Sequence, residues 1–187
     1  MSHLFSSLLL SAAVMTWAPS AQASSWKIDP KTSKISIIAT INSASAQGQF
    51  EKFSAIIDFD PEDLTSANIK VDVDLTAVKM KDPQQTAILG SADWFNTAQY
   101  PMATFTSTTI KATGNNTFEM SATLTLKGKT LPVTLPFIFM RNSKKARATG
   151  EFTLMRNDFK VGVGQFSSGS TVGFEVKLMI DINAEQT

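Results

Sequence analysis

The sequence contains no cysteine, and its one histidine is His3. Without cysteine the chain has no disulfide, no lipid-anchored cysteine and no Cys–His catalysis. Without a further histidine, Ser–His–Asp triads, the usual zinc sites and His-ligated haem are excluded as well. We therefore predict no metal ligand, no catalytic residue and no cofactor other than a bound ligand. Carboxylates, lysines and the single tyrosine, Tyr100, remain as acid–base groups, so these absences disfavour an enzyme without excluding one.

The sequence also lacks an excess of charge of either sign. Lysine and arginine number 17 and aspartate and glutamate 16, which leaves a net charge of +1 at pH 7. Nucleic-acid binding requires a concentrated basic surface, so we expect no nucleic-acid partner. The only basic cluster is RNSKKAR at residues 141–147. We interpret it as the solvated tip of a hairpin, and contact with anionic lipid headgroups is the alternative.

The N-terminal segment has the pattern of an export signal. Residues 4–17 carry no charge, Pro19 follows, and Ala21 and Ala23 provide the small residues of a cleavage site. The uncharged stretch is too short to be a stable membrane-spanning helix. Although no lysine or arginine precedes Leu4, we predict a signal peptide at 1–23 and one mature domain at 24–187 in the periplasm. A membrane-associated N-terminal helix is the alternative.

Nearly every segment after Trp26 alternates between apolar and polar residues. In residues 69–75, for example, Ile69, Val71 and Val73 alternate with lysine and aspartate. This period of two is typical of half-buried strands. The predicted strands are 34–41, 49–59, 69–75, 103–111, 118–127, 133–140, 147–155 and 172–182. Short strands separated by turn residues predict an all-β protein, an antiparallel lipocalin-like barrel of about eight strands.

One short helix interrupts the strands. Asp82 can cap its first turn, Pro83 suits its first position, and Ile88, Ala92 and Phe95 recur at helical spacing. We expect this helix to end near residues 94–96. The outward strand faces carry many charges, and these would be costly on the lipid-facing side of an outer-membrane barrel. We therefore expect water to surround the barrel.

The interior is open to two interpretations. Apolar alternating faces fit a solid core, and they fit equally a cavity that holds an apolar ligand. Arg156 continues the inward face of Phe152 and Leu154. A buried cation needs a partner, which would be either Asp158 or the polar headgroup of a ligand.

An ordered series of motifs resembles the YceI-like family over nearly the whole mature chain. The matching segments are Trp26-Lys27-Ile28-Asp29-Pro30, Gly48-Gln49-Phe50, Phe59-Asp60-Pro61, Ser91-Ala92-Asp93-Trp94-Phe95-Asn96, Tyr100-Pro101, Leu124-Thr125-Leu126-Lys127-Gly128-Lys129 and Arg156-Asn157-Asp158-Phe159-Lys160-Val161-Gly162. The resemblance implies a periplasmic, lipocalin-like barrel around a polyisoprenoid or isoprenoid-quinone-like lipid, without known catalytic residues. Many members have a basic, His-bearing helix start where this chain has QQTAILG at 84–90, which makes this site more apolar.

Together these observations predict a periplasmic protein that sequesters or carries such a lipid. The residues predicted to contact it are Phe53, Val73, Leu75, Leu89, Trp94, Phe95, Phe105, Leu124, Leu126, Phe137, Phe152, Leu154, Arg156 and Phe159. The expected partner is a long-chain apolar lipid. Transient contact with a membrane surface or with a quinone-linked membrane protein, and a homodimer, are further expectations. The alternatives are an enzyme that acts on a lipid headgroup and a ligand-free stress-response barrel.

Overall fold

The computed structural model describes residues 24–187, so the predicted signal peptide at 1–23 lies outside the described residues. The strands are β1 Ser25–Ile28, β2 Lys34–Ile41, β3 Ala44–Phe50, β4 Phe53–Asp60, β5 Asp63–Asp74, β6 Val78–Met80, β7 Met102–Gly114, β8 Thr117–Leu126, β9 Lys129–Asn142, β10 Lys145–Met155 and β11 Val172–Gln186. The helices are α1 Pro83–Leu89 and the 3-10 turns η1 Leu75–Ala77, η2 Arg156–Phe159 and η3 Gly164–Phe166.

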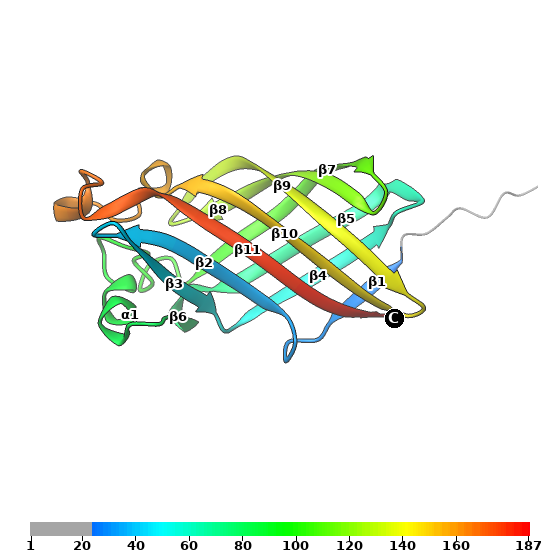
Figure 1. The fold of residues 1–187 in the computed structure, drawn as a ribbon, viewed down its shortest axis with the longest axis horizontal. Helices are drawn as coiled ribbons and strands as arrows, with labels where there is room; N and C mark the ends of the chain where they lie inside the picture. Colours follow the sequence, from blue (N-terminus) through cyan, green and yellow to red (C-terminus); the bar gives the residue numbers. More distant parts are fainter. Residues whose placement is uncertain (1–23) are drawn as a thin grey trace, which may run out of the picture.

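Eight of these strands close into an antiparallel ring. Their order is β1-β4-β5-β7-β8-β9-β10-β11, and β1 pairs back onto β11 with Trp26 opposite Gln186. Figure 1 shows the long strands tilted around a common axis, with α1 at one end and the C-terminus at the other. The predicted all-β barrel of about eight strands with one short helix is therefore confirmed.

The remaining three strands, β2, β3 and β6, extend the sheet from β11 at the α1 end of the barrel. β2 pairs with β11 beyond the stretch that pairs with β1, β3 pairs with β2, and β6 pairs with β3. The prediction of one continuous strand at 49–59 is wrong, because β3 ends at Phe50 and β4 begins at Phe53. The neighbouring strand is interrupted at the same level by η1, whose Leu75 is buried. Asp74 N–H donates to the Lys52 carbonyl at 3.0 Å and so ties the two interruptions together.

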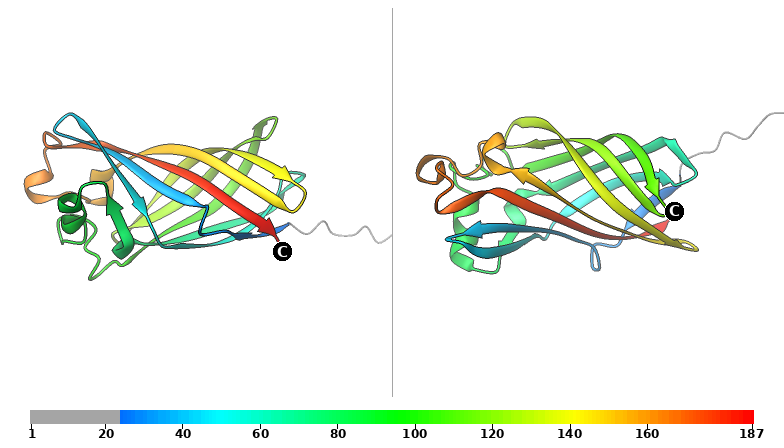
Figure 2. Two further views of the ribbon diagram at one scale, coloured as in Figure 1. Left: turned by 60° about the horizontal axis from the view of Figure 1, so that its bottom comes forward. Right: turned by 45° about the horizontal axis from the view of Figure 1, so that its top comes forward.

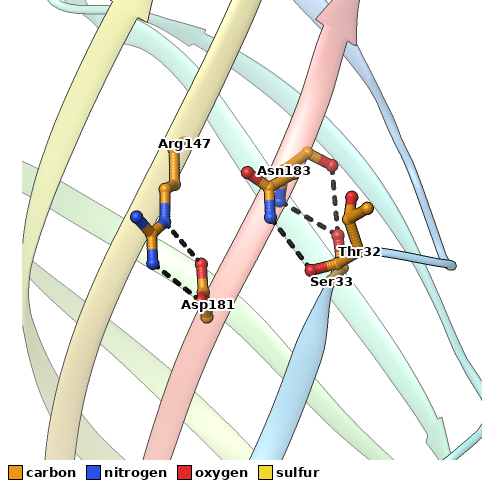
Figure 3. A network of polar contacts seen from close by, with 5 residues as sticks. All are labelled: Thr32, Ser33, Arg147, Asp181 and Asn183. Atoms are coloured by element: carbon orange, nitrogen blue, oxygen red, sulfur yellow. Dashed lines mark hydrogen bonds and ion pairs between the residues drawn. The ribbon is translucent and has the colours of Figure 1, made fainter.

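A seam in the outer wall marks where β11 changes its partner from β2 to β1 (Figure 3). Pairing with β2 ends at Asp181, and pairing with β1 begins at Ala184. Between them the Ser33 hydroxyl accepts from the Asn183 N–H at 3.0 Å and donates to the Asn183 carbonyl at 3.1 Å. The buried hydroxyl thus replaces the ladder hydrogen bonds that a strand residue would have made.

The helix α1 is shorter than predicted. Its start agrees with the sequence analysis, because the Asp82 carboxylate accepts from the Gln84 N–H at 2.8 Å and Pro83 opens the helix. It ends at Leu89 instead of near residues 94–96, since Gly90 ends the helix and the Phe95 N–H turns back to the Leu89 carbonyl at 2.9 Å. None of the helices within residues 24–187 is long and apolar enough to cross a bilayer.

Residues 81–101 connect β6 to β7 at the α1 end of the barrel, where these two strands do not pair with each other. The β5–β7 pairing ends at Asp74 opposite Met102, and β6 pairs with β3 only. Beyond that point α1 packs against β6 in place of a further strand. Figure 2 shows α1, the β2–β3 hairpin and the segment between β10 and β11 gathered at this end. One end of the barrel is therefore built from a helix and loops.

Candidate functional site

The burial of the strands differs around the barrel. Along β8 the inward residues from Phe118 to Leu126 are buried, so they alternate with the more exposed outward residues. Along β11 no such alternation exists, because both faces are partly accessible. The inward residues of β11, among them Leu178 and Ile180, are only partly buried and line a cavity inside the barrel. The interior on this side of the barrel is therefore hollow.

A cavity inside the barrel explains this accessibility. Its volume is about 310 Å³, and every atom that faces it is apolar. Ligand pockets typically enclose roughly 300–1,000 Å³ and are lined mainly by apolar side chains. The cavity reaches from Trp26 and Phe139 near the end of the barrel that holds the C-terminus to Leu89 of α1 at the other.

The floor of the cavity, at the end away from α1, is packed with aromatic rings. Phe59 is 1% exposed, and its ring meets those of Phe118, Phe137 and Phe139 edge-on at 4.9–5.8 Å. Edge-to-face contacts at such distances are favourable. The indole N–H of Trp26 donates to the Phe59 carbonyl at 2.8 Å. This end is therefore closed, and its polar atoms are satisfied within the floor.

The opposite end is held together by Arg156, which is 2% exposed. All five of its N–H groups donate to backbone carbonyls, those of Val161, Gly162, Phe166, Val172 and Gly173, at 2.6–2.9 Å. Of the two partners that the sequence left open, Asp158 is not the partner, because no ion pair joins the two side chains. The guanidinium instead ties the segment between β10 and β11 to the barrel, and none of its donors is left for a headgroup. We call residues 156–173 the cap.

Arg156 lies against two aromatic rings, and within the described part of the chain no acidic side chain forms an ion pair with it. Its guanidinium carbon lies 5.6 Å from the Trp94 ring centroid and 5.3 Å from that of Phe174, both within cation–π range. Burial lowers the pKa of Arg156 below its ordinary value, but arginine stays protonated in proteins. Gly162 has a φ of +72°, and a Cβ there would collide with the guanidinium. Carbonyl dipoles thus take the place of a carboxylate.

Lys127 provides a second tie at the same end. Lys127 and Gly128 form the β8–β9 turn, with φ values of 49° and 73°. The Lys127 Nζ donates to the carbonyls of Ala92 and Lys160 at 2.8 and 2.7 Å. Its pKa is lowered, mainly because of burial. The segment after α1 and the cap are therefore joined through one ammonium group.

Comparison with known proteins places this barrel in a family. The YceI-like domain model matches residues 26–184. The chain belongs to the YceI-like family. Protein YceI of Escherichia coli is 35% identical over 127 residues, which cover 66% of each chain and thus just under two thirds of that relative's length.

Solved structures show the same YceI-like fold. The crystal structure of BcnA from Burkholderia cenocepacia matches with a TM-score of 0.81 and 29% identity, over 83% of this chain and 98% of that one. A polyisoprenoid binding domain from Saccharophagus degradans matches with a TM-score of 0.71 over 88% of this chain and 99% of that one, at 14% identity. At that identity the second match supports the fold alone.

Thirteen of the fourteen residues predicted to contact a ligand lie on the cavity wall of this YceI-like barrel. They are Phe53, Val73, Leu75, Leu89, Trp94, Phe95, Phe105, Leu124, Leu126, Phe137, Phe152, Leu154 and Arg156. Phe159 does not reach the cavity, because it is buried in the cap at 2% exposure. The structure thus gives the location of these residues, and their contact with a ligand stays a prediction.

A large part of the cavity wall was not predicted from the sequence. The omitted residues come mainly from β2, β11 and the aromatic floor, and include Ile35, Ile37, Ile41, Trp26, Phe59, Phe139, Val176, Leu178, Ile180 and Ile182. Those of β2 and β11 stand on the apolar face of a regular alternation, so the period of two was the signal that identifies them. Trp26 lies on a strand of only four residues, which is too short to show a period.

The mouth of the cavity lies at the α1 end. Among the residues that line the cavity only Ile88 of α1 and Thr171 of the cap are exposed. The floor residues are all buried. Within residues 24–187, no group of three or more histidine, cysteine, aspartate or glutamate side chains could hold a metal ion. The arrangement can therefore desolvate an apolar chain admitted from one end.

Proposed function

We propose that this protein is a periplasmic lipid-binding protein that sequesters or carries a polyisoprenoid or isoprenoid-quinone-like lipid. The observation that carries the proposal is the apolar cavity that runs from the floor to α1. Transfer of apolar surface out of water contributes about 25 cal/mol per Å², so an enclosed hydrocarbon chain supplies most of the binding free energy. Charged or sugar ligands would find no hydrogen-bond partner in such an interior.

The shared fold is compatible with the same proposal. A polyisoprenoid binding domain from another organism has the same barrel architecture. The proposed periplasmic location is based on the signal-peptide pattern in the sequence of residues 1–23. Contact with a membrane surface, contact with a quinone-linked membrane protein and a homodimer stay predictions.

We further propose that the protein is not an enzyme. Among residues 24–187, Arg156 is the only charged residue of the cavity wall, and its donors are already bound to carbonyls. General acid–base catalysis needs a titratable group in hydrogen-bond reach of the reacting atoms. An enzyme that acts on a lipid headgroup would therefore need its titratable catalytic group outside the cavity.

Organic extraction of the purified protein followed by mass spectrometry tests the proposal. We expect a lipid with a long apolar chain in near-stoichiometric amount. The stripped protein is then titrated with farnesol, an isoprenoid alcohol, and with ubiquinone-2, a quinone on two isoprene units. A protein that purifies empty and binds neither compound would refute the proposal.

A further inference from the structure

The barrel wall between β9 and β10 is hydrogen-bonded along only part of its length. From their hairpin the two strands pair as far as Phe137 opposite Gly150. Beyond that point β9 pairs with β8 alone, and β10 pairs with β11 alone. Within the described part of the chain, no backbone pairing joins residues 129–136 of β9 to residues 151–155 of β10. We call this unpaired stretch of wall the slit, and it runs from Gly150 to the α1 end of the barrel.

Two prolines prevent β9 from pairing across the slit. The Phe139 N–H points toward β8, where it donates to the Asn116 carbonyl at 2.9 Å. Backbone groups of a strand point alternately to its two neighbours, and β9 follows β8 without a register shift. Residues 132, 134 and 136 therefore point their backbone groups toward β10. Pro132 and Pro136 have no N–H to donate, so two of these three positions cannot add to a ladder.

The cavity lies directly behind the slit. At the closed end of the slit the strands approach so closely that a Cβ on Gly150 would overlap the Pro136 carbonyl oxygen. Beyond this point both borders carry residues that line the cavity, Leu135 on β9 and Phe152 and Leu154 on β10. The slit is therefore the part of the side wall in which side chains alone separate the cavity from the outside.

The other end of the slit is fastened by Lys127. This lysine lies in the turn that leads into β9, and its ammonium group donates to the Lys160 carbonyl at 2.7 Å. Lys160 follows η2, which continues directly from β10, so this hydrogen bond joins the two sides of the slit. Within residues 24–187, no other hydrogen bond crosses the slit between Gly150 and Lys127.

We propose that the slit is a side gate to the cavity and that Lys127 is its clasp. Opening the slit breaks the bond of the clasp and separates side chains, whereas opening the wall between paired strands breaks a ladder of hydrogen bonds. A chain that enters through the open slit reaches the cavity along its length and does not thread end-on through the mouth. This inference rests on the proposed function and adds the route by which the lipid enters and leaves.

A cleavable cross-link across the slit tests the gate. The protein has no cysteine, so Thr134→Cys and Thr153→Cys, both exposed, place two unique thiols on opposite borders of the slit. A bis-maleimide with a disulfide in its linker joins them, and a reductant cuts the linker again. Uptake and release of ubiquinone-2 are followed by stopped-flow quenching of tryptophan fluorescence. We expect the link to slow both rates roughly tenfold, as for a blocked gating motion, and reduction to restore them.

A second linked pair is the control for the cross-link. Lys111→Cys and Glu119→Cys are exposed partners on the paired strands β7 and β8, and a link between them should change neither rate. If the linked slit exchanges ubiquinone-2 as fast as the reduced one, the side gate is overturned and the lipid-binding proposal stands. A protein that binds no ubiquinone-2 before it is linked would overturn the proposed function and the gate with it.

The clasp is tested by Lys127→Met in the full chain. We expect the association and dissociation rate constants of ubiquinone-2 to rise together, each roughly threefold to tenfold, so that Kd changes by less than about twofold. Lys160→Met is the control, because it alters the neighbouring side chain but keeps the carbonyl that accepts the bond. A faster dissociation alone would mean that Lys127 only stabilises the bound state. That result, or no change in either rate, would contradict its role as a clasp.

Discussion

The two ends of the barrel are closed by different kinds of interaction. The floor is closed by packed rings around Phe59, and its strands pair directly with one another. The α1 end is closed by loops, and these are held by hydrogen bonds that converge on Arg156 and Lys127. A packed aromatic end cannot open without unfolding strands. A loop end held by a few polar ties can open locally while the barrel stays folded. The α1 end is therefore the end that can open to admit a ligand.

The largest expected effect is at the floor. Phe59→Ala should lower the free energy of unfolding by about 3–5 kcal/mol, because it removes a buried ring and leaves a void among its neighbours. Urea unfolding followed by circular dichroism measures the change. Ile56→Ala, on the same strand but 59% exposed, is the matched control and should be nearly neutral. Equal losses for the two variants would show that the floor is not packed as described.

A smaller and more local effect is expected in the cap. Arg156→Met leaves five carbonyls without their donor, which would cost more than about 3 kcal/mol if the cap stayed in place. Because the cap can open to water, we expect a loss of about 2–3 kcal/mol. Hydrogen exchange should accelerate in residues 157–172 and stay slow in β8. Arg147→Met, which removes an exposed arginine from β10, serves as control. Uniform acceleration over the whole barrel would contradict a locally opening end.

The seam on β11 tests a polar tie that belongs to neither end. Ser33→Ala removes the hydroxyl that serves both the N–H and the carbonyl of Asn183. The expected loss is about 1–2 kcal/mol, because a backbone donor in a buried seam is left without a partner. Ser54→Ala on the exposed face of β4 is the control. Denaturant titration measures the free energy of unfolding of both variants. A Ser33→Ala variant as stable as Ser54→Ala would show that the Ser33 hydroxyl does not stabilise the seam.

The smallest effect concerns the exposed pair of Arg147 and Asp181, joined at 2.8 Å (Figure 3). Hydrogen bonds from Arg147 lower the pKa of Asp181 below its ordinary value of 3.8. A carboxyl with a lowered folded pKa contributes stability above the unfolded pKa and loses it as pH falls through the folded value. The small difference in stability between the parent and Asp181→Asn should therefore shrink below about pH 4 and at high salt. A difference independent of pH would exclude this linkage.

The fold could be predicted from the sequence because its main signals are local. Alternation along 172–182 and the Asp82-Pro83 start of α1 depend on near neighbours in the chain. β1 and β6 were missed because three or four residues cannot show a period. The inward direction of Arg156 also followed from alternation. Its carbonyl partners could not be predicted in this way, because they depend on how the sixteen residues between β10 and β11 fold back over the end of the barrel.

The alternation of apolar and polar residues also could not predict whether the interior of the barrel is hollow or solid. Leu178 and Ile180 have the same alternation as Met120 and Leu124 on β8. Leu178 and Ile180 are nevertheless only partly buried, whereas Met120 and Leu124 are buried. Whether opposing side chains meet depends on the diameter of the ring, and period alone does not report that diameter.

Ala148→Phe tests most directly the proposal that a hydrocarbon chain occupies the interior of the barrel. Ala148 lines the cavity and stands beside Phe139 and Ile182 on the neighbouring strands. A ring at this position fills the hollow without disturbing the outer surface. We predict that calorimetric titration of the stripped protein with farnesol gives at least ~10-fold weaker binding for the variant, at similar stability. Unchanged affinity in a folded variant would contradict the account, because the chain would then bind outside the barrel.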